Sequence, residues 1–304
     1  MSTAPPGPTV PPVPAEHPPP PERPELPDGA EPSPTDPGWR AWTAWVALVA
    51  GFAAAIVGAL VLSIAGAAFG APIDKPPPAV NILATFVQDL CLIGAAVLMA
   101  RIAGTPRRAD FGLRATRFWP AAGWTALAWG AFVAFTAAWV ALIGARDAQD
   151  GLPKELGADE STVALVAVGV LVCVVAPIAE ELFFRGYFFT ALRSWRGLWP
   201  AAAITGIVFG GIHAGGSDPA FLLPLAFFGF ALCLLYVRTR SLYPAVVAHA
   251  VNNSVAFGSS QHWGWEIAPT LLISLALIAL VFRLVATLGD GRRAAARGAP
   301  AAHH

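Results

Sequence analysis

Most of the chain after residue 38 consists of apolar runs that are separated by short polar or proline-containing breaks. A helix needs about 20 residues to cross the hydrocarbon core of a bilayer. Only 12% of the residues are charged, whereas about a quarter are charged in a typical soluble domain. The pattern predicts an all-α, polytopic membrane protein with about eight transmembrane helices, over residues 41–69, 79–103, 119–143, 161–192, 199–214, 219–237, 243–258 and 267–288.

The N-terminal segment 1–38 has a different composition. It is rich in proline and contains only scattered valine and leucine. Such a segment cannot bury enough apolar surface to offset the entropy of ordering, so we expect a disordered tail. It lacks a charged region followed by an apolar run, so it is not expected to be a signal peptide.

The basic residues predict how the chain lies in the membrane. Arginines gather in every second loop and near the C-terminus, while the loop around residues 147–160 is acidic. By the positive-inside rule, both termini are expected to be cytoplasmic. The formal net charge is zero, so no nucleic-acid partner is indicated. Cys91, Cys173 and Cys233 have neither metal-ligand nor redox spacing and are expected to act as small hydrophobic residues.

Charged residues stand out in the segment "APIAEELFFRGYFFT", residues 176–190. A charge in a transmembrane helix costs roughly 2.5–3.5 kcal/mol on insertion scales and marks a candidate functional site. Glu181 and Arg185 are four residues apart and can pair on one helical face. Glu180 lies about 100° further round without an obvious local partner. A solvated, inert pair at a helix end is the alternative, which the apolar residues on both sides disfavour.

Two histidines follow in later spans. His213 lies as far above the turn near residues 193–200 as Glu180 does, about 23 Å at 1.5 Å per residue, so the two are expected at one level. Gly206, Gly210 and Gly211 are expected to let these two helices approach closely. The segment "YPAVVAHAVNNSVAF" places His249 and Asn253 on one face of a third helix. The alternative is that these polar residues only join helices.

The motifs Glu-Glu-x-x-x-Arg, Phe-x-x-x-His and His-x-x-x-Asn, in this order, resemble the CPBP family of intramembrane proteases, which includes the CAAX prenyl endopeptidases. The matching residues are Glu180, Glu181 and Arg185, then Phe209 and His213, then His249 and Asn253. The resemblance covers residues 161–258 and implies a catalytic core there. Residues 39–160 would then hold N-terminal transmembrane helices, and 259–304 the last helix with a short basic cytoplasmic tail.

The resemblance implies peptide hydrolysis by an activated water, with Glu180 as the principal base, Glu181 held by Arg185, and His213 helping to bind the water. Two mechanisms stay open. Glu180, His213 and His249 could hold Zn²⁺ or another divalent metal. Alternatively, His249 and Asn253 could donate hydrogen bonds to the oxyanion without a metal. No His-Glu-x-x-His helix is present, so the sequence does not require zinc.

The expected function is therefore an endopeptidase of the bacterial cytoplasmic membrane that acts on peptide or membrane-protein substrates. A non-catalytic scaffold or maturation factor with the same fold is the alternative. A proton-coupled transporter is disfavoured because no repeated halves are visible. The sequence leaves one feature open. Gln88 and Asp89 interrupt the second span, where Asp89 could pair with Arg185, line a cavity, snorkel or join helices.

Overall fold

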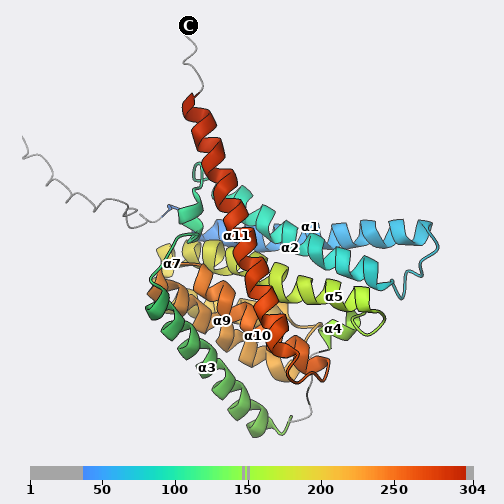
Figure 1. Cartoon of the computed structure of the whole chain (residues 1–304). Coiled ribbons are helices and arrows are strands. Elements are labelled where there is room, and N and C mark those ends of the chain that lie inside the picture. Colours follow the sequence, from blue (N-terminus) through green and yellow to red (C-terminus); the bar gives the residue numbers. More distant parts are fainter. Residues whose placement is uncertain (1–36, 146–147, 149–150, 299–304) are drawn as a thin grey trace, which may run out of the picture. The chain divides into compact units, whose positions relative to one another are not determined.

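The computed structural model describes residues 37–145, 148 and 151–298, with side chains to residue 287. The predicted disordered tail lies outside these residues, apart from its last two. The elements of the described chain are helices, as predicted. They include the short η1 (Arg108–Phe111) and α4 (Leu152–Glu155) in loops (Figure 1). The longer ones are α1 (Ala41–Ala68), α2 (Pro78–Ala100), α3 (Phe118–Ile143), α8 (Leu198–Ile212), α9 (Pro219–Thr239), α10 (Tyr243–Ser260), α11 (Ile267–Gly298) and a composite helix over Thr162–Arg196.

Six of the described helices are long and apolar enough to cross a membrane. They are α1, α2, α3, the composite helix, α9 and the part of α11 over Ile267–Thr287. The expected number was about eight. The two remaining helices, α8 and α10, are present at the predicted positions, but α8 has only 15 residues and α10 contains several polar side chains. The chain is a multi-pass membrane protein.

The composite helix carries the Glu-Glu motif between two stretches of π-helix. It consists of α5 (Thr162–Val170), η2 (Leu171–Val175), α6 (Ala176–Glu181), η3 (Leu182–Phe189) and α7 (Thr190–Arg196), of which η2 and η3 are π-helical. In a π-turn the backbone bonds run from i to i+5, and such turns are frequent at functional sites. The short α-helical segment α6 thus presents both glutamates between two irregular segments.

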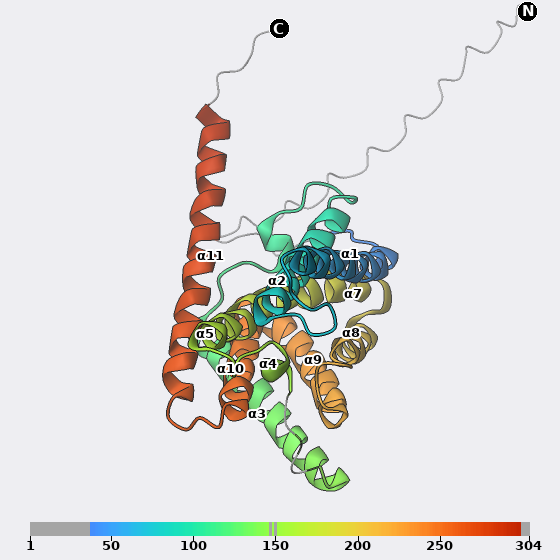
Figure 2. The same cartoon turned by 90° about the vertical axis from the view of Figure 1, so that its right-hand side faces the viewer.

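Glycines determine how closely α8 approaches a neighbouring helix, but the neighbour is not the one expected from the sequence. A Cβ atom on Gly206 or Gly210 would lie 2.5 Å from a backbone carbonyl oxygen of α9. A Cβ on Gly211 would meet nothing within 4 Å. The close approach is therefore between α8 and α9, which pack along each other as α1 and α2 do (Figures 1 and 2). The prediction of close packing between α8 and the composite helix through these glycines was wrong.

Helix α10 lies in the interior despite its polar residues. It packs against η2, α6, α3, α9 and α11. Most of its first half is buried, including Val246, Ala248 and His249. Because α10 runs alongside the composite helix, it brings its polar residues to the segment that carries the two glutamates.

Candidate active site

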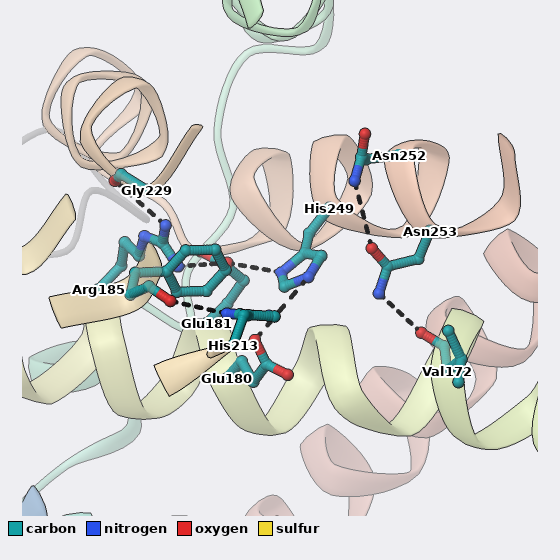
Figure 3. Close-up of polar contacts among 10 residues, drawn as sticks. Val172, Glu180, Glu181, Arg185, His213, Gly229, His249, Asn252 and Asn253 are labelled. Carbon is teal, nitrogen blue, oxygen red and sulfur yellow. Dashed lines mark hydrogen bonds and ion pairs between the residues drawn. The ribbon is translucent and has the colours of Figure 1, made fainter. Parts of the chain in front are cut away.

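Glu181 is the centre of a buried polar network (Figure 3). Its Oε1 atom accepts a hydrogen bond of 2.6 Å from Arg185 Nη1 and one of 2.8 Å from His249 Nδ1. The side chains of Glu181 and Arg185 are fully buried, and that of His249 is 3% exposed. The pair is therefore not a solvated one at a helix end. Its burial means that each charge depends on the other for stabilisation.

Arg185 is held by two further groups from two other helices. Its Nη2 atom donates to the carbonyl oxygen of Gly229 in α9 at 3.1 Å. Its guanidinium carbon lies 4.5 Å from the centre of the Phe209 ring in α8. The same ring lies 4.9 Å from the ring of His213 and 5.7 Å from that of His249. Phe209 thus connects all three motifs, a function that the sequence did not indicate.

Glu180 faces His249 from the other side of the imidazole. Its Oε2 atom lies 3.9 Å from His249 Nε2, which is too long for a direct hydrogen bond. This oxygen is buried and has no hydrogen-bond partner among the described residues, although the side chain as a whole is 15% exposed. As predicted, Glu180 does not share the arginine. Its carboxyl group is therefore available to a ligand that reaches it from the accessible side.

His213 follows the last residue of α8, and one of its ring nitrogens is already engaged. Its Nδ1 atom lies 2.7 Å from the carbonyl oxygen of Phe209. A carbonyl can only accept, so Nδ1 carries the hydrogen and Nε2 is the remaining acceptor of the neutral ring. The ring is partly buried. Among the described residues, no hydrogen bond or ion pair joins His213 to Glu180, so the structure leaves its expected contact with the water as a proposal.

Asn253 lies one helical turn beyond His249 and contacts the backbone of the composite helix. Its Nδ2 atom donates to the carbonyl oxygen of Val172 at 2.9 Å, and its Oδ1 accepts from Asn252 at 3.4 Å. Val172 lies in the π-helical segment η2. In this arrangement Asn253 fixes the distance between α10 and the π-turn. One hydrogen of its amide group remains for another acceptor.

Asp89 of α2 is a buried acid beside the site. It is 1% exposed, and its Oδ2 atom has no hydrogen-bond partner among the described residues. It does not pair with Arg185, which is bonded to Glu181 and Gly229, and its burial excludes snorkelling. Its carboxyl group interacts electrostatically with that of Glu180. The expectations of an Arg185 pair and of snorkelling were therefore wrong, while those of lining a cavity and of joining helices stay predictions. Its neighbour Gln88 is partly buried.

Several side chains of the site have atoms that can bind a metal ion. Among the side chains that the structure describes, no three or more of His, Cys, Asp and Glu are grouped so that they could hold a metal ion. Glu180 and His249 have suitable donor atoms, but His213 is not grouped with them in this geometry. The described residues therefore do not form a ready three-ligand site.

Comparisons with known proteins find sequence similarity in the part of the chain that forms this site. Residues 162–255 match the family model described as "Type II CAAX prenyl endopeptidase Rce1-like". A segment of 81 residues is 35% identical to "Putative membrane peptidase YdiL" of Bacillus subtilis (strain 168), and it covers 27% of this chain and 32% of that protein. The aligned segment thus spans about a third of this relative. No solved structure matches the chain.

The matched segment begins at the first residue of α5 and ends within α10, so it contains all three motifs and the whole buried network. Through this segment the chain is similar to Rce1-like CAAX prenyl endopeptidases and to a membrane peptidase of Bacillus subtilis. The first three long helices, α1 to α3, lie outside the match.

Proposed function

We propose that the chain is an intramembrane endopeptidase that hydrolyses peptide bonds of membrane-associated or peptide substrates with a water activated by Glu180 and histidine. The observation that supports this most is the position of His249 between the two glutamates. Glu181 binds its Nδ1 atom at 2.8 Å, while Nε2 is directed at Glu180 at 3.9 Å. An oriented histidine beside an accessible carboxylate is the arrangement that acid–base catalysis requires.

The separation of 3.9 Å leaves Glu180 Oε2 free to bind a water molecule beside the imidazole. Polar contacts longer than 3.5 Å often involve a water molecule. A water that donates one hydrogen to Glu180 Oε2 would be in reach of the base. Glu180 then takes a proton from the water as its oxygen attacks the carbonyl carbon of the scissile bond. The same proton passes to the leaving nitrogen as the C–N bond breaks, which restores the carboxylate.

Glu181 and Arg185 act on His249 rather than on the peptide bond. Because a carboxylate can only accept, Glu181 requires a hydrogen on Nδ1 of His249 and so fixes both its tautomer and its orientation. Arg185 supplies the positive charge that allows Glu181 to be ionised while fully buried. We assign Glu181 and Arg185 as positioning residues. His213 Nε2 is assigned to the water or the substrate.

A divalent metal such as Zn²⁺, with Glu180, His213 and His249 as ligands, is the second form of this proposal. When bound, a metal would polarise the carbonyl or the water. It would require His213 to approach the other two residues. Metal analysis of the purified chain tests this form: one equivalent per chain, lost together in the His213→Ala and His249→Ala variants, would support it. No metal in active protein would rule it out.

The location and substrate are also part of the proposal. The distribution of arginines supports both termini in the cytoplasm, and we place the chain in the bacterial cytoplasmic membrane. A peptide or membrane protein is the expected substrate, since Glu180 and Glu181 lie on a helix that is long and apolar enough to cross a bilayer.

The test is a comparison of protein N-termini in cells that carry wild type, Glu180→Ala or the control Glu160→Ala. Glu160 is an exposed acid of the loop before α5, so its loss leaves the site intact. New N-termini in membrane or secreted fractions are expected with wild type and the control, and absent with Glu180→Ala at equal protein levels. If Glu180→Ala gives the wild-type profile and complements a deletion strain, the chain acts as a non-catalytic scaffold instead.

A further inference from the structure

Asp89 is the acidic group that the proposed reaction has not used. It lies in the interior of α2, a helix that packs against η2, α6 and η3 of the composite helix. A buried carboxyl group without a compensating partner is unfavourable, and buried polar groups in native proteins nearly always have a hydrogen-bond partner or a function. The described residues give its Oδ2 atom no such partner.

Asp89 is also electrostatically coupled to Glu180. Glu180 Oε2 is likewise buried without a hydrogen-bond partner among the described residues. Glu180 lies in α6, one of the segments against which α2 packs. These two packed helices therefore each carry a buried carboxyl oxygen that can accept a hydrogen bond.

We propose that Asp89 is a further residue of the active site, and that it holds the attacking water together with Glu180. The inference rests on the proposed function. A water molecule has two hydrogens to donate. If Glu180 accepts one of them and Asp89 accepts the other, a lone pair on the water oxygen is directed away from both acids and toward the substrate carbonyl.

This arrangement gives the two acids different functions. Glu180 takes the proton that is transferred, because it is the one that faces His249 at 3.9 Å and is partly accessible. Asp89 touches the reacting water but keeps its place in the wall of the site, because it is almost completely buried. The site thus includes α2, which lies outside the segment that matches the peptidase family.

The first test is kinetic and uses a peptide that spans a cleavage site found in the comparison of N-termini. The chain in lipid nanodiscs carries Asp89→Asn, or Asp74→Asn as a matched control in the exposed loop before α2. Asparagine has the shape of aspartate but offers a donor where the water needs an acceptor. We expect kcat to fall on the order of 10²-fold for Asp89→Asn, with KM unchanged and only a small shift of Tm, and no effect of the control.

Two results would overturn the inference. One is an unchanged kcat for Asp89→Asn while Glu180→Ala is inactive, which would leave the proposed function intact. The other is a loss of kcat that is matched by a loss of Tm, which would make Asp89 a structural residue. If instead Glu180→Ala cleaves the peptide as wild type does, the proposed function itself fails.

A second test does not depend on catalysis. Asp89→Asn and Glu180→Gln are introduced singly and together, and the melting temperature of each variant is measured in nanodiscs. Groups that bind one water lose it with either substitution, so the shift of the double variant should differ from the sum of the single shifts. Asp74→Asn combined with Glu180→Gln should give additive shifts. Additive shifts for Asp89 and Glu180 would show that the two residues do not act as a unit.

Discussion

Replacing Arg185 with methionine removes the cation from the buried network and leaves a side chain of similar length. Arg185 and Glu181 are both fully buried, and the arginine makes two hydrogen bonds, to Glu181 at 2.6 Å and to the Gly229 carbonyl at 3.1 Å. It also stacks on Phe209, with 4.5 Å between the guanidinium carbon and the ring centre. The substitution leaves Glu181 with only the bond to His249.

The expected cost follows from this loss. Breaking a buried ion pair by removing one partner costs about 3–5 kcal/mol, because the other charge remains buried without compensation. At about 2–4 °C per kcal/mol for a chain of a few hundred residues, Arg185→Met should lower the melting temperature by roughly 6–20 °C. The hydrogen bond to Gly229 is part of the same loss, since neighbouring contributions are not additive.

The assay is thermal unfolding of the purified chain in nanodiscs. Arg196→Met, at the exposed end of α7, is the matched control and should change stability by less than about 0.5 kcal/mol. The double variant Arg185→Met with Glu181→Leu removes both charges and should recover part of the lost stability, because a buried pair can often be replaced by apolar residues. The reasoning is refuted if Arg185→Met melts at the same temperature as the control.

Two further predictions concern packing around the site. Asn253→Ala should lower the free energy of unfolding by about 1–3 kcal/mol, because it leaves the Val172 carbonyl in the π-turn without its donor; Asn252→Ala is the control, and equal melting temperatures for the two variants would contradict the assignment. Gly210→Ala should reduce the yield of folded protein and its melting temperature, because the added Cβ would lie 2.5 Å from a carbonyl oxygen of α9. Gly211→Ala, at an open position, should be tolerated, and similar behaviour of the two alanine variants would show that the α8–α9 contact is looser than described.

Local spacing was enough to predict some of these features. The Glu181–Arg185 pair follows from a separation of four residues in a helix, and it forms although Arg185 lies in the π-helical segment η3. The positions of the long helices follow from apolar runs of sufficient length. Both depend only on residues that are near one another in the sequence.

Other features depend on how the helices pack, and the sequence does not carry that information. The contact between His249 and Glu181 arises because α10 lies beside the composite helix. The glycines of α8 permit close approach to any neighbour, and only the fold determines that the neighbour is α9. The π-turns have no sequence signature comparable to a helix cap, so the contact of Asn253 with a π-turn carbonyl could not be anticipated.

The environment of Asp89 also could not be predicted from the sequence. Its position in an apolar span identified it as unusual, but four environments were open because Glu180, which acts on it electrostatically, lies about 90 residues further along the chain. The structure selects among them by burial and by the neighbouring Glu180.

The most direct test of the account is cleavage of an identified substrate peptide by the purified chain in water enriched in ¹⁸O. Mass spectrometry of the new C-terminus reports whether solvent oxygen enters the carboxyl group. We predict ¹⁸O in the product of wild type, and no product above background with Glu180→Gln although that variant folds and binds the peptide. Cleavage by Glu180→Gln at the wild-type rate would show that Glu180 is not the base and would contradict the proposed active site.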